Sequence, residues 1–174
     1  MADSLYRDAT ERALAYARQH RRTIQGQVGS GWDGIILSTD IKAAIKALRH
    51  EPLYSRERDV YRRLSEHRIT QLAGFRIPRL IGFDDTLWVV EMELVSPPFI
   101  VDFAGARVDS EIDFPEEITA EWVSQKQEVF GDNWPAVRKW IFAFRQHGIY
   151  LGDINPNNIK FAGDEPPARR RSSG

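Results

Sequence analysis

Residues 29–48 read GSGWDGIILSTDIKAAIKAL, a stretch in which a glycine cluster precedes two apolar runs. Gly29, Gly31 and Gly34 match the pattern G-x-G-x-x-G, and isoleucines follow the third glycine. Short β-rich runs separated by Gly and Asp predict antiparallel strands, so we expect the glycine cluster to lie between two strands of a hairpin. In a dinucleotide-binding fold the same pattern lies between a strand and a helix. The context therefore favours a hairpin that covers the phosphates of a nucleotide.

Glycine suits such a hairpin for two reasons. A Cβ atom would hold the backbone away from the phosphate oxygens, and we expect the turn to require positive φ angles. A plain glycine-rich hairpin without a ligand would produce the same pattern, and short motifs of this kind also occur by chance.

The next candidate is a lysine in the strand expected over residues 43–48. Lys46 lies in a run so apolar that its ammonium group should point toward an anion. Lys42 falls on the same face by strand alternation, but it is nearer to the start of the strand and ranks second. The alternative is a solvent-exposed lysine on an edge strand.

A helical pattern over residues 54–67 supplies an acidic partner for this lysine. Glu57 lies two turns before Leu64, which anchors the helix, and it can reach back to Lys46. A lysine paired in this way is held extended toward the α- and β-phosphates of a nucleotide. The alternative is a solvated, charge-rich helix face.

Further along the chain we expect two strands, over residues 77–83 and 87–95, because both segments are rich in β-branched and apolar residues. The consecutive prolines after Ser96 end the second strand. Residues 99–132 are polar and acidic, with weak helical stretches near 116–130.

A clear helical pattern covers residues 134–147. Asn133 is its expected cap, Pro135 is tolerated in the first turn, and Gly148 ends it. The loop that follows contains Asp153 and Asn158, with Pro156 between them, and precedes a short strand. A carboxylate at an acceptor hydroxyl and an amide oxygen on Mg²⁺ would explain this arrangement. The alternative is an ordinary turn, because Asp, Asn and Pro all favour turns.

Bulk properties restrict the class of protein. The chain has 174 residues, a net charge of −1 and no cysteine, so it is the length of one domain or two small lobes and forms no disulfide. No apolar run approaches the roughly 20 residues that span a bilayer. We therefore expect a cytoplasmic protein that binds neither membrane nor nucleic acid. Paired arginines occur, but interleaved aromatics and a basic net charge do not.

Taken in order over residues 24–161, these features resemble the protein-kinase-like superfamily, which includes small-molecule kinases. The resemblance implies an α+β fold with an antiparallel N-lobe sheet carrying one helix, a hinge, and a reduced, mostly helical C-lobe. The expected divisions are an N-terminal amphipathic helix, the N-lobe, the C-lobe with its catalytic-type loop, and a disordered basic tail, over residues 1–22, 23–95, 96–165 and 166–174.

The resemblance also implies roles for single residues. The three glycines would cover ATP, Lys46 would bind its phosphates and Glu57 would pair with Lys46. The hinge from Glu93 to Val95 would meet the adenine with its backbone. Asp153 would be the catalytic base, and Asn158 would be a ligand of Mg²⁺.

Several family features are missing. Leu151-Gly152 replaces the usual His-Arg before the aspartate, and Phe161 is followed by AGDEPP, without the Asp-Phe-Gly whose aspartate holds Mg²⁺. We therefore expect a truncated kinase-like protein that binds ATP between its lobes, with weak or absent phosphotransfer. The alternative is a catalytically dead pseudokinase that acts as a protein-interaction module. The phosphoryl acceptor, the protein partner and the oligomeric state stay open.

Overall fold

The structure, a computed structural model, describes residues 2–95, 99–100, 103, 105–110, 116–152, 154, 156 and 159–161. It is an α+β fold, as expected, and a five-stranded antiparallel sheet forms its first part. In the order β1-β2-β3-β7-β6, the sheet consists of β1 (Ile24–Ser30), β2 (Gly34–Thr39), β3 (Ala43–Leu48), β7 (Val89–Glu93) and β6 (Leu80–Asp84).

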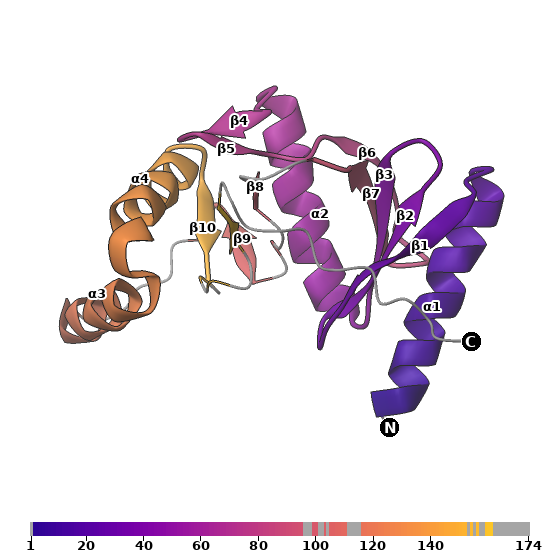
Figure 1. Cartoon of the computed structure of the whole chain (residues 1–174), viewed down its shortest axis with the longest axis horizontal. Helices are drawn as coiled ribbons and strands as arrows, with labels where there is room; N and C mark the ends of the chain where they lie inside the picture. Colours follow the sequence, from indigo (N-terminus) through magenta and orange to yellow (C-terminus); the bar gives the residue numbers. More distant parts are fainter. Residues whose placement is uncertain are drawn as a thin grey trace.

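One helix packs on each face of this sheet (Figure 1). Strand alternation sends Ile35 and Ile45 toward α1 (Ala2–Gln19), whereas Ala44 and Val90 join the core that contains α2 (Glu51–Glu66). All residues of β3 are buried, because this strand is covered from both sides. The sheet is therefore the middle layer of three.

Polar contacts attach α1 to the sheet. The guanidinium of Arg12 donates to the carbonyl oxygens of Leu87, at 2.6 Å, and Leu48, at 2.8 Å. Glu91, buried under the helix, accepts from Arg22 at 2.7 Å and from the hydroxyl of Tyr16 at 3.2 Å. Burial, followed by the neighbouring Glu91 carboxylate, raises the pKa of Tyr16, so this hydroxyl stays a hydrogen-bond donor.

The second part of the fold consists of two helices and short strands, two of which precede β6 in the chain. A four-stranded sheet has the order β11-β8-β5-β4, and β9 pairs with β10. These strands are β4 (Gln71–Leu72), β5 (Phe75–Arg76), β8 (Phe99–Ile100), β9 (Ala106–Val108), β10 (Ile149–Leu151) and β11 (Ile159–Lys160). The helices are α3 (Glu116–Phe130) and α4 (Trp134–Arg145), joined by the 3₁₀ turn Gly131–Asn133.

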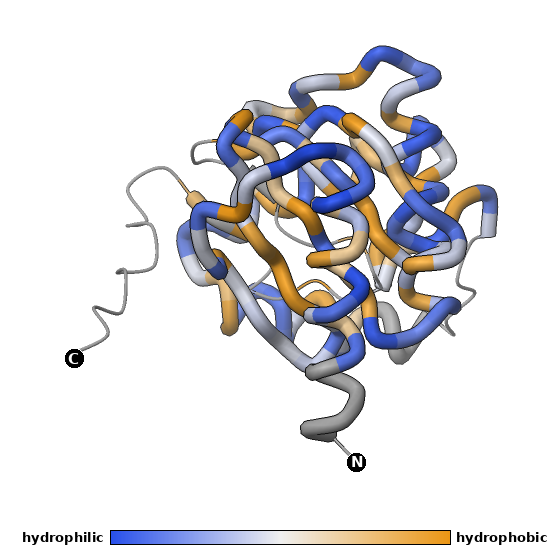
Figure 2. The backbone as a smooth tube through the Cα atoms, turned by 90° about the vertical axis from the view of Figure 1, so that its right-hand side faces the viewer, coloured by the Kyte–Doolittle hydropathy of each residue, from blue (hydrophilic) through white to orange (hydrophobic). Residues whose placement is uncertain are grey.

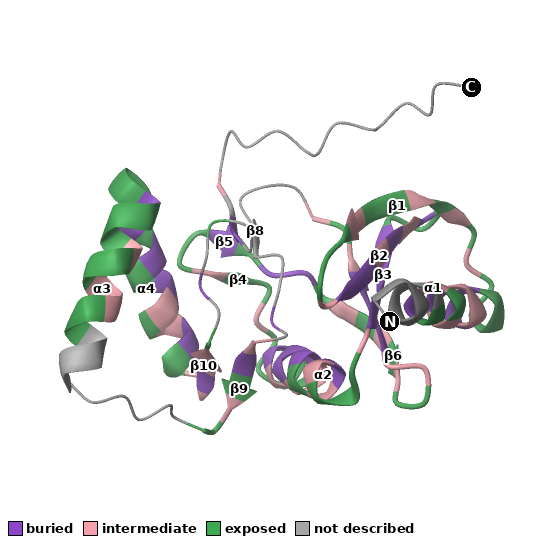
Figure 3. Ribbon diagram, turned by 90° about the horizontal axis from the view of Figure 1, so that it is seen from below, coloured by how far each residue is buried: buried purple, intermediate pink, exposed green. Residues whose placement is uncertain are grey.

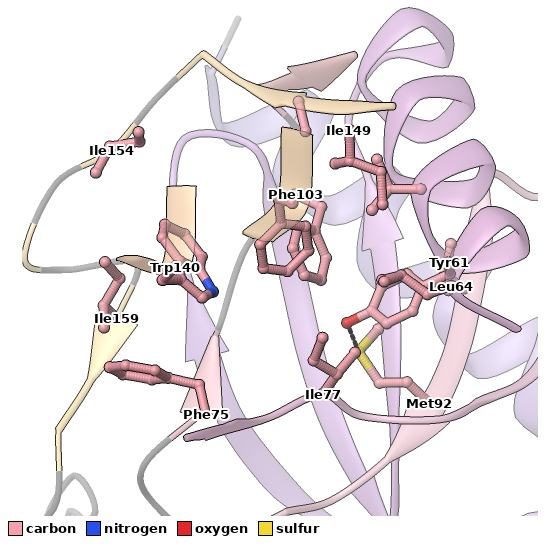
Figure 4. Packing of buried hydrophobic residues seen from close by; sticks show 14 of the residues in the cluster. Tyr61, Leu64, Phe75, Ile77, Met92, Phe103, Trp140, Ile149, Ile154 and Ile159 are labelled. Carbon is pink, nitrogen blue, oxygen red and sulfur yellow. Dashed lines mark hydrogen bonds between the residues drawn. The ribbon is translucent and has the colours of Figure 1, made fainter. Parts of the chain in front are cut away.

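A continuous hydrophobic core joins the two parts across α2 (Figure 4). Tyr61 on α2 donates to the sulfur of Met92 on β7 at 3.0 Å and meets the ring of Phe103 edge-on. Phe103 in turn contacts Phe144 on α4, which packs against Trp140. By contrast, α3 is largely exposed (Figure 3).

Several expected elements have different bounds or contacts. The α2 helix begins at Glu51, earlier than expected, with Pro52 in its first turn. The expectation that Asn133 caps α4 is wrong, because this residue belongs to the 3₁₀ turn, has helical φ and ψ and makes no side-chain cap bond. Gly148 does end the helical segment, with a φ of +70°. The expected disordered tail, 166–174, lies outside the described residues.

No helix among the described residues is both long enough and apolar enough to cross a membrane. Hydrophobic and hydrophilic residues instead alternate in short stretches along the backbone (Figure 2).

Candidate functional site

Lys46 lies at the centre of the first sheet, on the face that α2 covers. Its strand neighbours are Ile36 on β2 and Val90 on β7, and only 2% of its side chain is exposed. The position follows from alternation: Lys46 points to the same side as Ala44, which belongs to the core around α2. A lysine ammonium is rarely enclosed to this degree without charged partners.

Glu57 on α2 is the first of these partners. Its carboxylate lies 2.7 Å from the Lys46 ammonium and is fully buried. The side chain lies on the inward face of α2, where Tyr54, Val60 and Tyr61 are also buried. The contact expected between Lys46 and Glu57 is therefore present.

Asp33, in the turn between β1 and β2, is the second partner. Its carboxylate lies 3.1 Å from the Lys46 ammonium, and its side chain is 24% exposed. Among the described residues, two carboxylates from different elements thus contact this lysine, and Asp33 is the more exposed of the two.

Close packing, not an unusual backbone conformation, explains a glycine of the β1–β2 hairpin. None of Gly29, Gly31 and Gly34 has a positive φ, so the expectation of left-handed backbone in this turn is wrong. A Cβ on Gly34 would collide with the carbonyl oxygen of Ala47 on β3. Glycine at this position therefore allows β2 to approach β3 at the start of their pairing.

The three charges are costly to bury. Removing a carboxylate or an ammonium from water costs several kcal/mol per ion, and the attraction between the partners offsets this cost only in part. A hydrophobic pair of similar volume would usually be as stable or more stable. The Lys46–Glu57 pair is therefore better explained by a requirement for a charge at this place than by stability.

The sequence could have revealed Asp33 through strand register. Gly34 pairs with Leu48, so the turn before Gly34 must lie beside the end of β3, close to Lys46. The backbone N–H of Arg49 indeed donates to the carbonyl oxygen of Asp33 at 2.8 Å. The glycine pattern alone does not single out Asp33, because aspartate is common in turns of any kind.

Lys42, the second candidate, is placed differently. It lies in the turn before β3 with a φ of 57°, and its side chain is exposed. It is therefore not part of the buried group formed by Asp33, Lys46 and Glu57.

The expected hinge, Glu93 to Val95, begins at the last residue of β7. The backbone N–H groups of Glu93 and Leu94 already donate to the carbonyl oxygens of Arg79 and Lys42. Among the hinge residues, Val95 must therefore supply any backbone donor to a ligand.

The segment that follows the expected catalytic base is anchored at two points. Ile154 and Ile159 are buried in the core, and the ammonium of Lys126 donates to the carbonyl oxygen of Ile154 at 2.5 Å. β11, the short strand expected after the loop, is present. Asp153 and Asn158 themselves lie outside the described residues, so their roles stay predictions.

No three His, Asp or Glu side chains gather closely enough to hold a metal ion in the described part of the chain. No protein-family model matches this chain, and no curated protein sequence matches it either.

Proposed function

We propose that the chain is a protein-kinase-like nucleotide-binding protein that binds ATP through Lys46, with weak or absent phosphotransfer. The observation that supports this most directly is the buried Lys46 ammonium, held at 2.7 Å by Glu57 and adjoined by the glycine-rich turn. This group combines two features that phosphate binding requires. They are a fixed positive charge and a glycine-rich backbone turn close to that charge.

The order of the elements also supports the proposal. A strand, a glycine-rich turn, a strand, a strand with the lysine and a helix with the glutamate follow one another, and two more strands complete the sheet. This is the order on which the resemblance to the kinase-like superfamily rests. By that resemblance the adenine would lie against the backbone near Val95 and the phosphates against Lys46.

The alternative is a catalytically dead pseudokinase that acts by binding another protein. The 174 residues contain no Asp-Phe-Gly, which favours it, because the aspartate of that motif normally holds the metal ion. Only the first proposal requires ATP binding, so ATP binding is tested before phosphotransfer.

The binding test measures thermal and urea unfolding of the purified chain with and without ATP. A ligand that binds only the folded state stabilises it by about 2.7 kcal/mol at a hundredfold excess over Kd. We compare the wild type with the double variant Lys46→Met/Glu57→Leu, which removes the ammonium and the buried carboxylate together and keeps the packing volume. Lys42→Met is the matched control, because it removes a nearby but exposed lysine.

We expect ATP to stabilise the wild type and Lys42→Met equally, and to leave the double variant unaffected. Equal stabilisation of the wild type and the double variant would contradict Lys46 as the phosphate-binding residue. No stabilisation of the wild type would contradict ATP binding itself.

A further inference from the structure

The carboxylate of Asp33 lies where an anion from solvent would have to approach Lys46. Of the two carboxylates on this lysine, Glu57 is fully buried on α2, whereas Asp33 is partly exposed. Within the described residues, the partly exposed side of the ammonium is therefore the one that Asp33 occupies.

The β1–β2 turn holds Asp33 in this inward position. The N–H of Gly31 donates to the carbonyl oxygen of Gly34 at 3.0 Å and closes the turn, while the Asp33 carbonyl accepts from Arg49. A Cβ on Gly31 would lie only 2.9 Å from a carboxylate oxygen of Asp33, so glycine makes room for this carboxylate. The neighbouring Trp32 points outward and is 74% exposed.

We propose that Asp33 competes with the phosphates of the nucleotide for Lys46, as an internal anion that the ligand must displace. This inference rests on the proposed function and specifies how the site is regulated. The described residues Asp33, Lys46 and Glu57 together carry a formal charge of −1, so a phosphate beside an inward Asp33 would meet a like charge. Binding must break the Asp33–Lys46 contact. This cost lowers the affinity of the site for any polyphosphate.

The test compares the wild type with Asp33→Asn, which keeps the shape of the side chain and the backbone bond to Arg49 but removes the charge. Asp132→Asn is the matched control, because it removes one exposed carboxylate between α3 and α4, far from β3 (Figure 1). Affinities for ATP, inorganic tripolyphosphate and adenosine are measured by isothermal titration calorimetry in EDTA. Circular dichroism checks folding, and Asp33→Ser replaces the asparagine variant if that variant does not fold.

Asp33→Asn should bind ATP and tripolyphosphate about three- to tenfold more tightly than the wild type, the range expected for loss of one partly exposed ion pair. Adenosine, which has no phosphate, should bind both proteins equally, and Asp132→Asn should behave like the wild type. If Asp33→Asn binds polyphosphate and the wild type does not, the competition would also be supported. ATP binding by the wild type would then be contradicted.

Other outcomes overturn the inference. Equal or weaker polyphosphate binding by Asp33→Asn, with normal binding by the wild type, would show that Asp33 does not compete, and the proposed function would stand. Absence of polyphosphate binding in both proteins would overturn the inference and the proposed function together.

Discussion

Lys46 and Glu57 form a pair of opposite charges that is almost completely removed from water. If either residue is replaced alone, the other remains as a buried charge that has lost this partner. Breaking a buried pair in this way costs about 3–5 kcal/mol, whereas replacing both members by apolar residues of similar volume is often neutral or stabilising. The energetic role of the pair can therefore be measured separately from its role in binding.

We predict that Lys46→Met lowers the free energy of unfolding by about 3–5 kcal/mol, and that the double variant recovers most of this loss. Glu57→Leu should cost less than Lys46→Met, because Asp33 still contacts the ammonium. Urea unfolding of the four proteins gives the coupling energy. Asp33 does not prevent the recovery, because its partly exposed side chain can turn into solvent. Losses that simply add in the double variant would contradict a coupled buried pair.

The glycines show where local sequence rules apply and where they do not. The pattern Gly29, Gly31, Gly34 correctly predicted a hairpin between two strands. The expectation that the turn requires positive φ angles is wrong. Glycine is required at position 34 because β3, which follows later in the chain, packs too closely for a Cβ. A contact between strands depends on their register, and the glycine pattern alone does not contain that information.

Helix α1 illustrates the same limit for a whole element. Ala9, Ala13 and Ala17 recur at helical spacing in the sequence, which predicts an amphipathic helix, and all three are buried. Periodicity shows which side of a helix is buried but not what covers it. The contact with the sheet became visible only in the structure, through Arg12 and through the buried carboxylate of Glu91.

We predict that Arg22→Met destabilises the fold by about 1–3 kcal/mol, because it leaves the buried Glu91 carboxylate without its cation. The estimate lies below that for a fully buried pair, since Arg22 is partly exposed and Tyr16 still donates to Glu91. Thermal and urea unfolding measure the loss. Arg18→Met, which removes an exposed arginine from α1, should cost little. Equal effects of the two variants would contradict a specific role for the Arg22–Glu91 pair.

For the whole molecule, the sequence predicted the first part better than the second. β1 to β3, α2 and the two later strands of the first sheet have strong local signals. α3 also occupies the stretch in which weak helical signals were seen. β8 and β9 are two and three residues long, too short for a periodic pattern, and they form only because distant strands pair with them.

The candidate site shows the same division. The contact between Lys46 and Glu57 could be predicted because a strand and the helix that follows it are close in the chain. The place of Asp33 depends on the pairing of β2 with β3 and on the fold of the turn, and sequence reasoning did not find it.

We predict that the isolated chain transfers the γ-phosphate of ATP weakly or not at all. Phosphoryl transfer requires metal ions that neutralise the developing charge, and a kinase fold normally supplies two oxygen ligands for them. Here the expected ligand is Asn158, a neutral amide, and the Asp-Phe-Gly aspartate is missing. Mg²⁺ favours carboxylates and gives up its waters reluctantly, so an amide alone holds it poorly. The assay follows labelled γ-phosphate in the wild type and Asp153→Asn with a general acceptor. Robust Mg²⁺-dependent transfer that disappears in the variant would contradict the prediction and establish Asp153 as a working catalytic base.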